Sequence, residues 1–178
     1  MTTPIQHETI IILDFGSQYT QLIARRIREA GVYCEILPFN TPIERIVARQ
    51  PKGLVLSGSP YSVYQDGAPH PDSKLLHSLQ CPLLGICYGL HILAFDMGGE
   101  VKSSNNREFG YARLKVVDGS SSLFQGLPAE MDVWMSHGDQ MTSVPGGFRV
   151  SSIRSQATTI TALSFWDTNP SAANFRRR

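Results

Sequence analysis

Short apolar runs alternate with segments of helical spacing through the first half of the sequence, and this alternation limits the fold more than any other feature. The run TIIILD at 9–14 ends in an acidic residue followed by FGS, as a buried parallel strand often does. Three further runs, at 32–39, 53–58 and 82–87, have the same character. Helical segments separate the four runs, so we expect a doubly wound α/β fold: a mostly parallel, flavodoxin-like sheet with helices on both faces.

Cap and turn residues predict where the helices between these strands begin and end. Ser17 is a candidate N-cap for a helix that Gly31 terminates. Thr41, followed by Pro42 and then Glu44, predicts a capping box at the start of the next helix. Two more helices are expected, over 72–79 and 88–98.

The pattern changes from about residue 100 to alternating strands and loops, which predicts an antiparallel extension of the sheet. The segments YARLKVV, DVWMSHGDQ and FRVSSI carry this pattern. A further strand is expected at 158–165, and 167–178 is polar and rich in turn residues, which predicts a disordered end. We therefore expect one domain over 9–154 and a divergent, partly disordered tail over 155–178.

Composition excludes several classes of function. The chain has 178 residues, enough for one domain with a sizeable core, and lacks an apolar run long enough to cross a bilayer. Sixteen basic and fifteen acidic side chains give a net charge of +1, and three of the arginines are the last three residues, so neither nucleic acid nor a membrane is expected as a partner. Three cysteines without disulfide or zinc spacing, and no secretory signal at the N-terminus, favour a reducing, cytoplasmic location without a bound metal.

The stretch PLLGICYGL contains the strongest candidate for chemistry. Cys87 has glycine two residues away on each side, at Gly85 and Gly89, which is the thiol form of a nucleophile elbow. At such a turn we expect the helix dipole to lower the thiol pKa, and the Tyr88 amide to donate to an oxyanion. Gly58, in the LSGSP segment after the adjacent strand, could supply the second donor. A small buried thiol at the end of a core strand is the structural alternative.

Five segments together resemble the class I glutamine amidotransferase domain, and in particular its GMP synthase branch. Over residues 9–154 the sequence is similar to this family in order and spacing. The segments are IIILDFGSQYTQLIARRIRE, LVLSGSPYSVY, LLGICYGLHILA, REFGYARL and SHGDQM.

The resemblance implies that glutamine is hydrolysed through a cysteine thioester, and that the ammonia released serves the conversion of XMP to GMP in purine biosynthesis. It implies that Cys87 is the nucleophile, that Gly58 and Tyr88 form the oxyanion hole, and that substrate contacts come from a loop with Ser136, His137 and Asp139. Where the family has a substrate-binding glutamine, this chain has His91. No cofactor is expected in this domain, because ATP and Mg²⁺ belong to the synthetase domain or chain that is the implied partner.

One part of the family pattern is missing. The family's catalytic histidine and glutamate lie in a motif resembling F-H-P-E after the HGD segment, yet no histidine follows His137, and the only acidic residue after Asp139 is Asp167. We therefore expect weak activity or none, unless His91, one helical turn after Cys87, or His137 replaces the base. Three alternatives remain open: a non-catalytic module that binds or regulates a synthetase, a flavodoxin-like phosphate binder that uses LDFGSQYTQ, and a thiol hydrolase with His137 as base.

Overall fold

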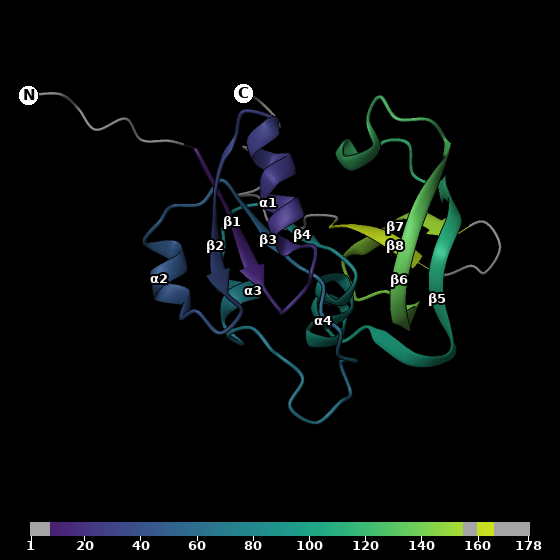
Figure 1. Cartoon of the computed structure of the whole chain (residues 1–178), viewed down its shortest axis with the longest axis horizontal. Helices are drawn as coiled ribbons and strands as arrows, with labels where there is room; N and C mark the ends of the chain where they lie inside the picture. Colours follow the sequence, from purple (N-terminus) through teal and green to yellow (C-terminus); the bar gives the residue numbers. More distant parts are fainter. Residues whose placement is uncertain (1–7, 155–159, 166–178) are drawn as a thin grey trace, which may run out of the picture. The chain divides into compact units, whose positions relative to one another are not determined.

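The computed structural model describes residues 8–154 and 160–165, which form two compact units divided at residues 92 and 93. Figure 1 shows the parallel strands of the first unit and the antiparallel strands of the second. The elements are β1 (Thr9–Asp14), α1 (Thr20–Glu29), β2 (Tyr33–Pro38), α2 (Ile43–Val47), β3 (Gly53–Leu56), α3 (Leu75–Ser78), β4 (Leu83–Gly85), α4 (Tyr88–Asp96), β5 (Glu100–Val116), the 3-10 turn η1 (Ser122–Phe124), β6 (Glu130–Ser143), β7 (Phe148–Arg154) and β8 (Ile160–Phe165).

The first unit contains a parallel four-stranded sheet in the order β2-β1-β3-β4. The chain moves from β1 outward to β2 and then returns to β3 on the other side of β1, so the direction of winding reverses between β1 and β3. In sheets of this kind, ligands gather at the carboxyl ends of the strands at that reversal. The expected α/β fold is confirmed, and the reversal places the segments after Asp14 and after Leu56 next to each other.

The core of this unit lies between α1 and the sheet. Ala24 of α1 is fully buried with Ile12 of β1, Cys34 of β2 and Val55 of β3, and half-buried isoleucines surround this cluster. Apolar residues recur along α1 at helical spacing, which is why one face of the helix packs on the strands.

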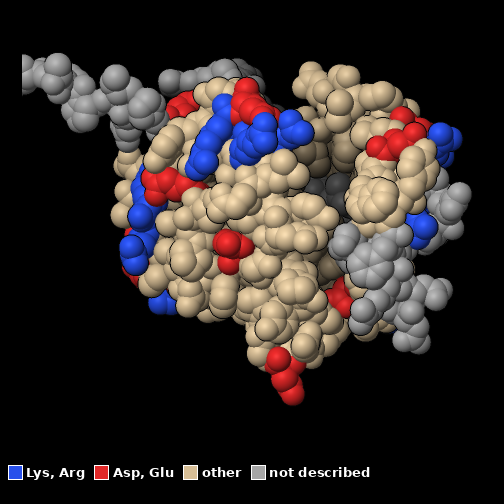
Figure 2. All heavy atoms as spheres, viewed as in Figure 1, with Lys and Arg blue, Asp and Glu red and all other residues tan. Residues whose placement is uncertain are grey.

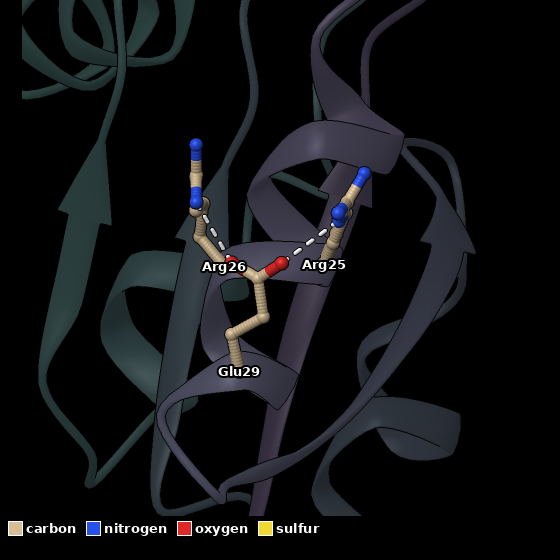
Figure 3. A network of polar contacts seen from close by, with 3 residues as sticks. All are labelled: Arg25, Arg26 and Glu29. Atoms are coloured by element: carbon tan, nitrogen blue, oxygen red, sulfur yellow. Dashed lines mark hydrogen bonds and ion pairs between the residues drawn. The ribbon is translucent and has the colours of Figure 1, made fainter.

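The outer face of α1 is charged. The Glu29 carboxylate accepts hydrogen bonds from Arg25 Nε and Arg26 Nη1, each at 2.8 Å (Figure 3). The Arg25 hydrogen bond, followed by that from Arg26, holds the pKa of Glu29 below its ordinary value. Basic and acidic side chains lie beside one another on the face drawn in Figure 2. Because these groups are well exposed to water, the pairs contribute little to stability.

The helix starts differ from the expected caps. Ser17 does not cap α1, because its Oγ accepts from the Tyr19 amide at 3.1 Å within a local turn and the helix begins at Thr20. Thr41 does not form a capping box, because its Oγ1 donates to the Pro38 carbonyl at 2.7 Å. In both cases a nearer backbone partner competes with the helix amides for the hydroxyl.

The second unit contains an antiparallel four-stranded sheet in the order β6-β5-β7-β8. The antiparallel extension is therefore confirmed as a sheet of its own. Its buried side chains include Val101, Ala112, Leu114, Met135 and Met141. The strand expected at 158–165 is present as β8, while the predicted disorder at 167–178 lies outside the described residues. No helix in the described part of the chain is long and apolar enough to span a membrane.

The packing of β1 predicts how stability responds to truncation of a core side chain. Replacing the fully buried Ile12 with alanine should lower the free energy of unfolding by about 3 kcal/mol, because apolar contact is lost and a cavity remains. Leu22→Ala on α1 is the control, since Leu22 is 45% exposed and its loss should cost less than about 0.5 kcal/mol. Urea unfolding measures both values, and equal losses would contradict the assignment of the core.

Candidate functional site

Cys87 lies on a tight turn between a strand and a helix. β4 ends at Gly85 and α4 begins at Tyr88, and Cys87 between them has a φ of 50°, in the left-handed region. The Cys87 carbonyl accepts hydrogen bonds from the amides of Leu90 at 2.9 Å and His91 at 3.1 Å, so it starts the hydrogen-bond pattern of α4. A non-glycine residue held in this region carries strain that the surrounding packing must support, and such strain is concentrated at functional sites.

The glycines on either side of Cys87 allow the turn to pack closely. A Cβ on Gly85 would lie 2.6 Å from the carbonyl carbon and oxygen of Gly89, and one on Gly89 would run into the backbone carbonyl of Leu56 at the end of β3. The Ile86 amide donates to that same Leu56 carbonyl at 3.0 Å. Side chains at 85 and 89 would collide with backbone atoms, which is the physical reason for glycine at both positions of the predicted elbow.

Gly58 lies against Cys87. A Cβ built on Gly58 would be 3.7 Å from the Cys87 Cβ and 3.3 Å from Ser17 Oγ, so a side chain there would press on both residues. The loop after β3, the turn after β1 and the elbow after β4 therefore meet at one point. This confirms the expectation that the carboxyl ends of the strands bring these segments together.

Tyr88 is held from two directions. Its ring lies against Phe15, with ring centroids 5.8 Å apart, and its hydroxyl donates to the Pro69 carbonyl at 2.8 Å. The side chain is only 2% exposed, so both contacts are shielded from water. These contacts restrain the first residue of α4, whose backbone amide is the proposed oxyanion donor.

The environment of the Cys87 thiol differs from the expected one. Burial raises the pKa of Cys87 above its ordinary value of 9.0, because the thiolate is removed from water. A helix N-terminus favours an anion by roughly 0.3–1 kcal/mol, which corresponds to less than one pKa unit. The expectation of a lowered pKa is therefore wrong for the chain as it stands.

His91 is buried within α4, with an exposure of 4%, so it is not a residue of the helix surface. Its place on the same face as Cys87 was inferred from helical spacing, which requires helical dihedral angles at both positions. Because Cys87 has a φ of 50°, its side chain does not follow the helical direction, and helical spacing no longer supports His91 as the base.

Ser136, His137 and Asp139 belong to the second unit. A loop was expected there, but all three residues lie within β6, opposite Phe109, Glu108 and Ser103 of β5. A register shift in β5 between Ser103 and Glu108 falls opposite the step from His137 to Asp139. Asp139 is 4% exposed. The roles of these three residues in substrate binding stay predictions.

A pocket of about 640 Å³ opens at the carboxyl ends of β1 and β2. Among the residues that the structure describes, its lining is mostly apolar and includes Asp14 but no lysine or arginine: Asp14, Phe15, Gly16, Ile36, Leu37, Pro38, Phe39, Tyr61, Gly67 and Pro69. The Gly16 amide already donates to Asp14 Oδ1 at 2.9 Å. An anionic carboxylate that occupies a backbone donor does not favour phosphate, so the flavodoxin-like alternative gains no support from this pocket.

Ser57 and Phe15 lie within the LSGSP and LDFGSQYTQ segments, but neither of them has a role in this site that was predicted from the sequence. Ser57 is fully buried, and its Oγ accepts from the Phe15 amide at 3.0 Å. The available signal was positional, since each residue immediately follows the carboxyl end of one of two neighbouring parallel strands.

The family model described as glutamine amidotransferase class-I matches residues 11–170. Among curated relatives, the glutamine-hydrolysing GMP synthase of Elusimicrobium minutum is 53% identical over 146 residues, which cover 82% of this chain and 28% of that protein. The GMP synthase of Chlorobaculum tepidum is 51% identical over 167 residues, or 93% of this chain and 32% of that protein. The chain thus spans less than a third of the length of these relatives, and the domain boundary at residue 154 stays a prediction.

Solved structures have the same fold. A Thermoplasma acidophilum protein, described as a candidate component of GMP synthase, is 29% identical with a TM-score of 0.79, covering 92% of this chain and 80% of that one. A glutamine amidotransferase of Thermotoga maritima is 20% identical with a TM-score of 0.70, covering 90% of this chain and 72% of that one. The second likeness concerns the fold alone.

The contact between Gly89 and β3 predicts a large effect of a single methyl group. Gly89→Ala should lower the free energy of unfolding by about 3 kcal/mol or prevent folding, because the new Cβ meets the Leu56 backbone. Gly119→Ala is the matched control, since no atom lies within 4 Å of its added Cβ. Thermal unfolding compares the two variants, and a Gly89→Ala protein as stable as the control would contradict the close packing.

The pKa of Cys87 predicts how its alkylation depends on pH. Only the thiolate reacts, so a raised pKa means that the reactive fraction is small at neutral pH and that the rate still increases above pH 9.0. The rate of iodoacetamide modification, measured at each cysteine by peptide mass spectrometry, checks this. A plateau below about pH 8 would show a lowered pKa instead.

Proposed function

The chain belongs to the class-I glutamine amidotransferase family. We propose that it is the glutamine-binding domain of a GMP synthase-like protein, in which glutamine acylates Cys87 but glutaminase turnover is slow. The observation that carries the proposal is the Cys87 turn, with φ at 50° and Gly58 packed against it. This geometry belongs to the part of the chain that is about half identical to glutamine-hydrolysing GMP synthases.

The proposed chemistry begins at the Cys87 sulfur. The thiolate attacks the side-chain amide carbon of glutamine, and a C–S bond forms while the carbonyl oxygen becomes an oxyanion. The Gly58 and Tyr88 amides are proposed to stabilise that oxyanion. The C–N bond then breaks, the nitrogen takes a proton and leaves as ammonia, and water cleaves the thioester to give glutamate and the free thiol. His91, Ser136, His137 and Asp139 are proposed to contact the substrate.

The slow step follows from the missing base. Resemblance to the family implies a histidine and a glutamate beyond the HGD segment, whereas this sequence has no histidine after His137. Departure of the amine requires a proton donor and attack by water requires a proton acceptor, so both halves of the reaction are impaired. The raised pKa of Cys87 adds to the effect by lowering the fraction of thiolate.

The absence of a histidine after His137 also favours a second function. If turnover is negligible, the domain would act as a non-catalytic module that binds or regulates a synthetase chain. The relatives support this partner class, because their matched region is less than a third of each protein. The conversion of XMP to GMP, with its use of ATP and Mg²⁺, would belong to that partner, and the ammonia from glutamine hydrolysis in this domain would be its substrate only where turnover occurs.

The test is covalent labelling of Cys87 and glutaminase turnover, measured on the same sample. A diazoketone alkylates the thiol with loss of dinitrogen, so labelling reports binding of the glutamine analogue at Cys87. We expect a diazoketone analogue of glutamine to label Cys87, as seen by intact mass and peptide mapping. Glutaminase turnover should be slower than in a complete amidotransferase by about 10⁴-fold or more, the typical cost of a lost triad member.

Two variants control this experiment. Cys87→Ser should abolish labelling, whereas Cys81→Ser should leave it unchanged. Cys81 is a matched control because it is also a partly buried thiol whose pKa is raised by burial. Turnover at the rate of a complete enzyme would show that the base is not missing. A folded protein that the analogue does not label would overturn glutamine binding.

A further inference from the structure

Ser57 connects the ends of two neighbouring strands through one hydroxyl group. It is fully buried, its Oγ accepts from the Phe15 amide at 3.0 Å, and the same hydroxyl donates to the Gly58 carbonyl at 3.1 Å. Its amide donates to the Leu13 carbonyl at 3.1 Å. Ser57 therefore fixes the turn after β1 and the Gly58 backbone at the same time.

Phe15 extends this connection to the elbow. Its backbone amide is bound by Ser57, and its ring lies against Tyr88, the residue directly after Cys87. Phe15 is 2% exposed and is also stacked on Phe39, with centroids 5.7 Å apart, so its ring has little freedom to move. The two proposed oxyanion donors, Gly58 and Tyr88, are thus joined through Ser57 and Phe15.

Glycine makes such a connection necessary. Gly58 has no side chain to restrict its dihedral angles. Its N–H lies in the peptide plane that contains the Ser57 carbonyl, and its own carbonyl lies in the next plane, so the direction of the N–H depends on how the chain is held on both sides of the residue. The hydrogen bonds of Ser57 hold the chain on both sides of Gly58. A donor that is already oriented stabilises an oxyanion without reorganisation during the reaction.

We propose that Ser57 is a positioning residue that sets the orientation of the Gly58 backbone, and that Phe15 aligns Tyr88 with it, so that the two amides form one oxyanion site. The inference rests on the proposed function in one respect, which is that the Gly58 and Tyr88 amides are the two oxyanion donors. It concerns any acyl transfer to Cys87 and does not depend on recognition of glutamine.

Two reagents separate positioning from general stability. In acylation by p-nitrophenyl acetate, the Cys87 sulfur bonds to the carbonyl carbon, an oxyanion forms, and nitrophenolate leaves. In alkylation by iodoacetamide, the sulfur displaces iodide directly, and no oxyanion forms. The ratio of the two rate constants at Cys87 therefore reports the oxyanion site, while changes in thiol exposure or pKa affect both rates.

Ser57→Ala should lower the acylation rate of the full chain by about 10-fold or more, while alkylation stays within about twofold. The matched control is Thr41→Val, which removes another buried hydroxyl that donates to a backbone carbonyl, at Pro38, and should change neither rate. Phe15→Leu keeps the backbone amide and an apolar side chain, and should lower the same ratio by a smaller factor. It serves as the second variant if Ser57→Ala fails to fold.

An unchanged ratio in the folded variants would overturn the inference, as would an equal fall in both rates, which would mean that Ser57 supports the fold alone. A ratio in the parent chain no higher at Cys87 than at Cys81 would also overturn it, since no oxyanion site would exist. A Ser57 effect in a protein that the glutamine analogue does not label would support the inference and reject the proposed function.

Discussion

The close approach of the α4 start to the end of β3 is the constraint on which the site depends. The Leu56 carbonyl accepts from the Ile86 amide, and Gly89 lies so near the same group that no side chain fits. To make that approach the chain must reverse within two residues, which places Cys87 at a φ of 50°. The strained residue is therefore a consequence of packing a helix directly onto a neighbouring parallel strand.

Two opposing effects act on the Cys87 sulfur at this position. The turn puts it at the start of a helix, where the helix dipole favours an anion, but the same close packing withdraws it from water. Burial raises the pKa of the Cys87 thiol above its ordinary value. A thiol in this state depends on a base or a bound substrate for activation, so a neighbouring base would matter more here than it would for an exposed, acidic thiol.

The strands and the elbow could be predicted from the sequence because both depend on local patterns, whereas contacts between distant segments could not. Apolar runs mark β1 to β4, and the glycines at 85 and 89 report a backbone contact that only glycine permits. Helical spacing from Cys87 to His91 does not establish that their side chains share a face, because a single left-handed residue changes the direction of a side chain. Ser57 and Phe15 are 42 residues apart, and nothing in the two motifs that contain them indicates that they are hydrogen-bonded to each other. Their hydrogen bond exists because β1 and β3 are neighbours with carboxyl ends at one edge, which is a property of topology.

The parts of the site come from different places along the chain. The turn at 14–17, Ser57, Gly58 and the elbow at 85–89 all belong to the first unit, and the contacts described among them join residues of that unit. The resemblance to the family implies proton-transfer residues after the HGD segment, where this sequence has no further histidine. Formation of the acyl-enzyme depends mainly on the residues of the first unit, which present Cys87 and the oxyanion donors. Departure of ammonia and hydrolysis of the thioester depend on the implied proton-transfer residues. A change confined to the later segment can therefore remove turnover while the turn that presents Cys87 remains intact.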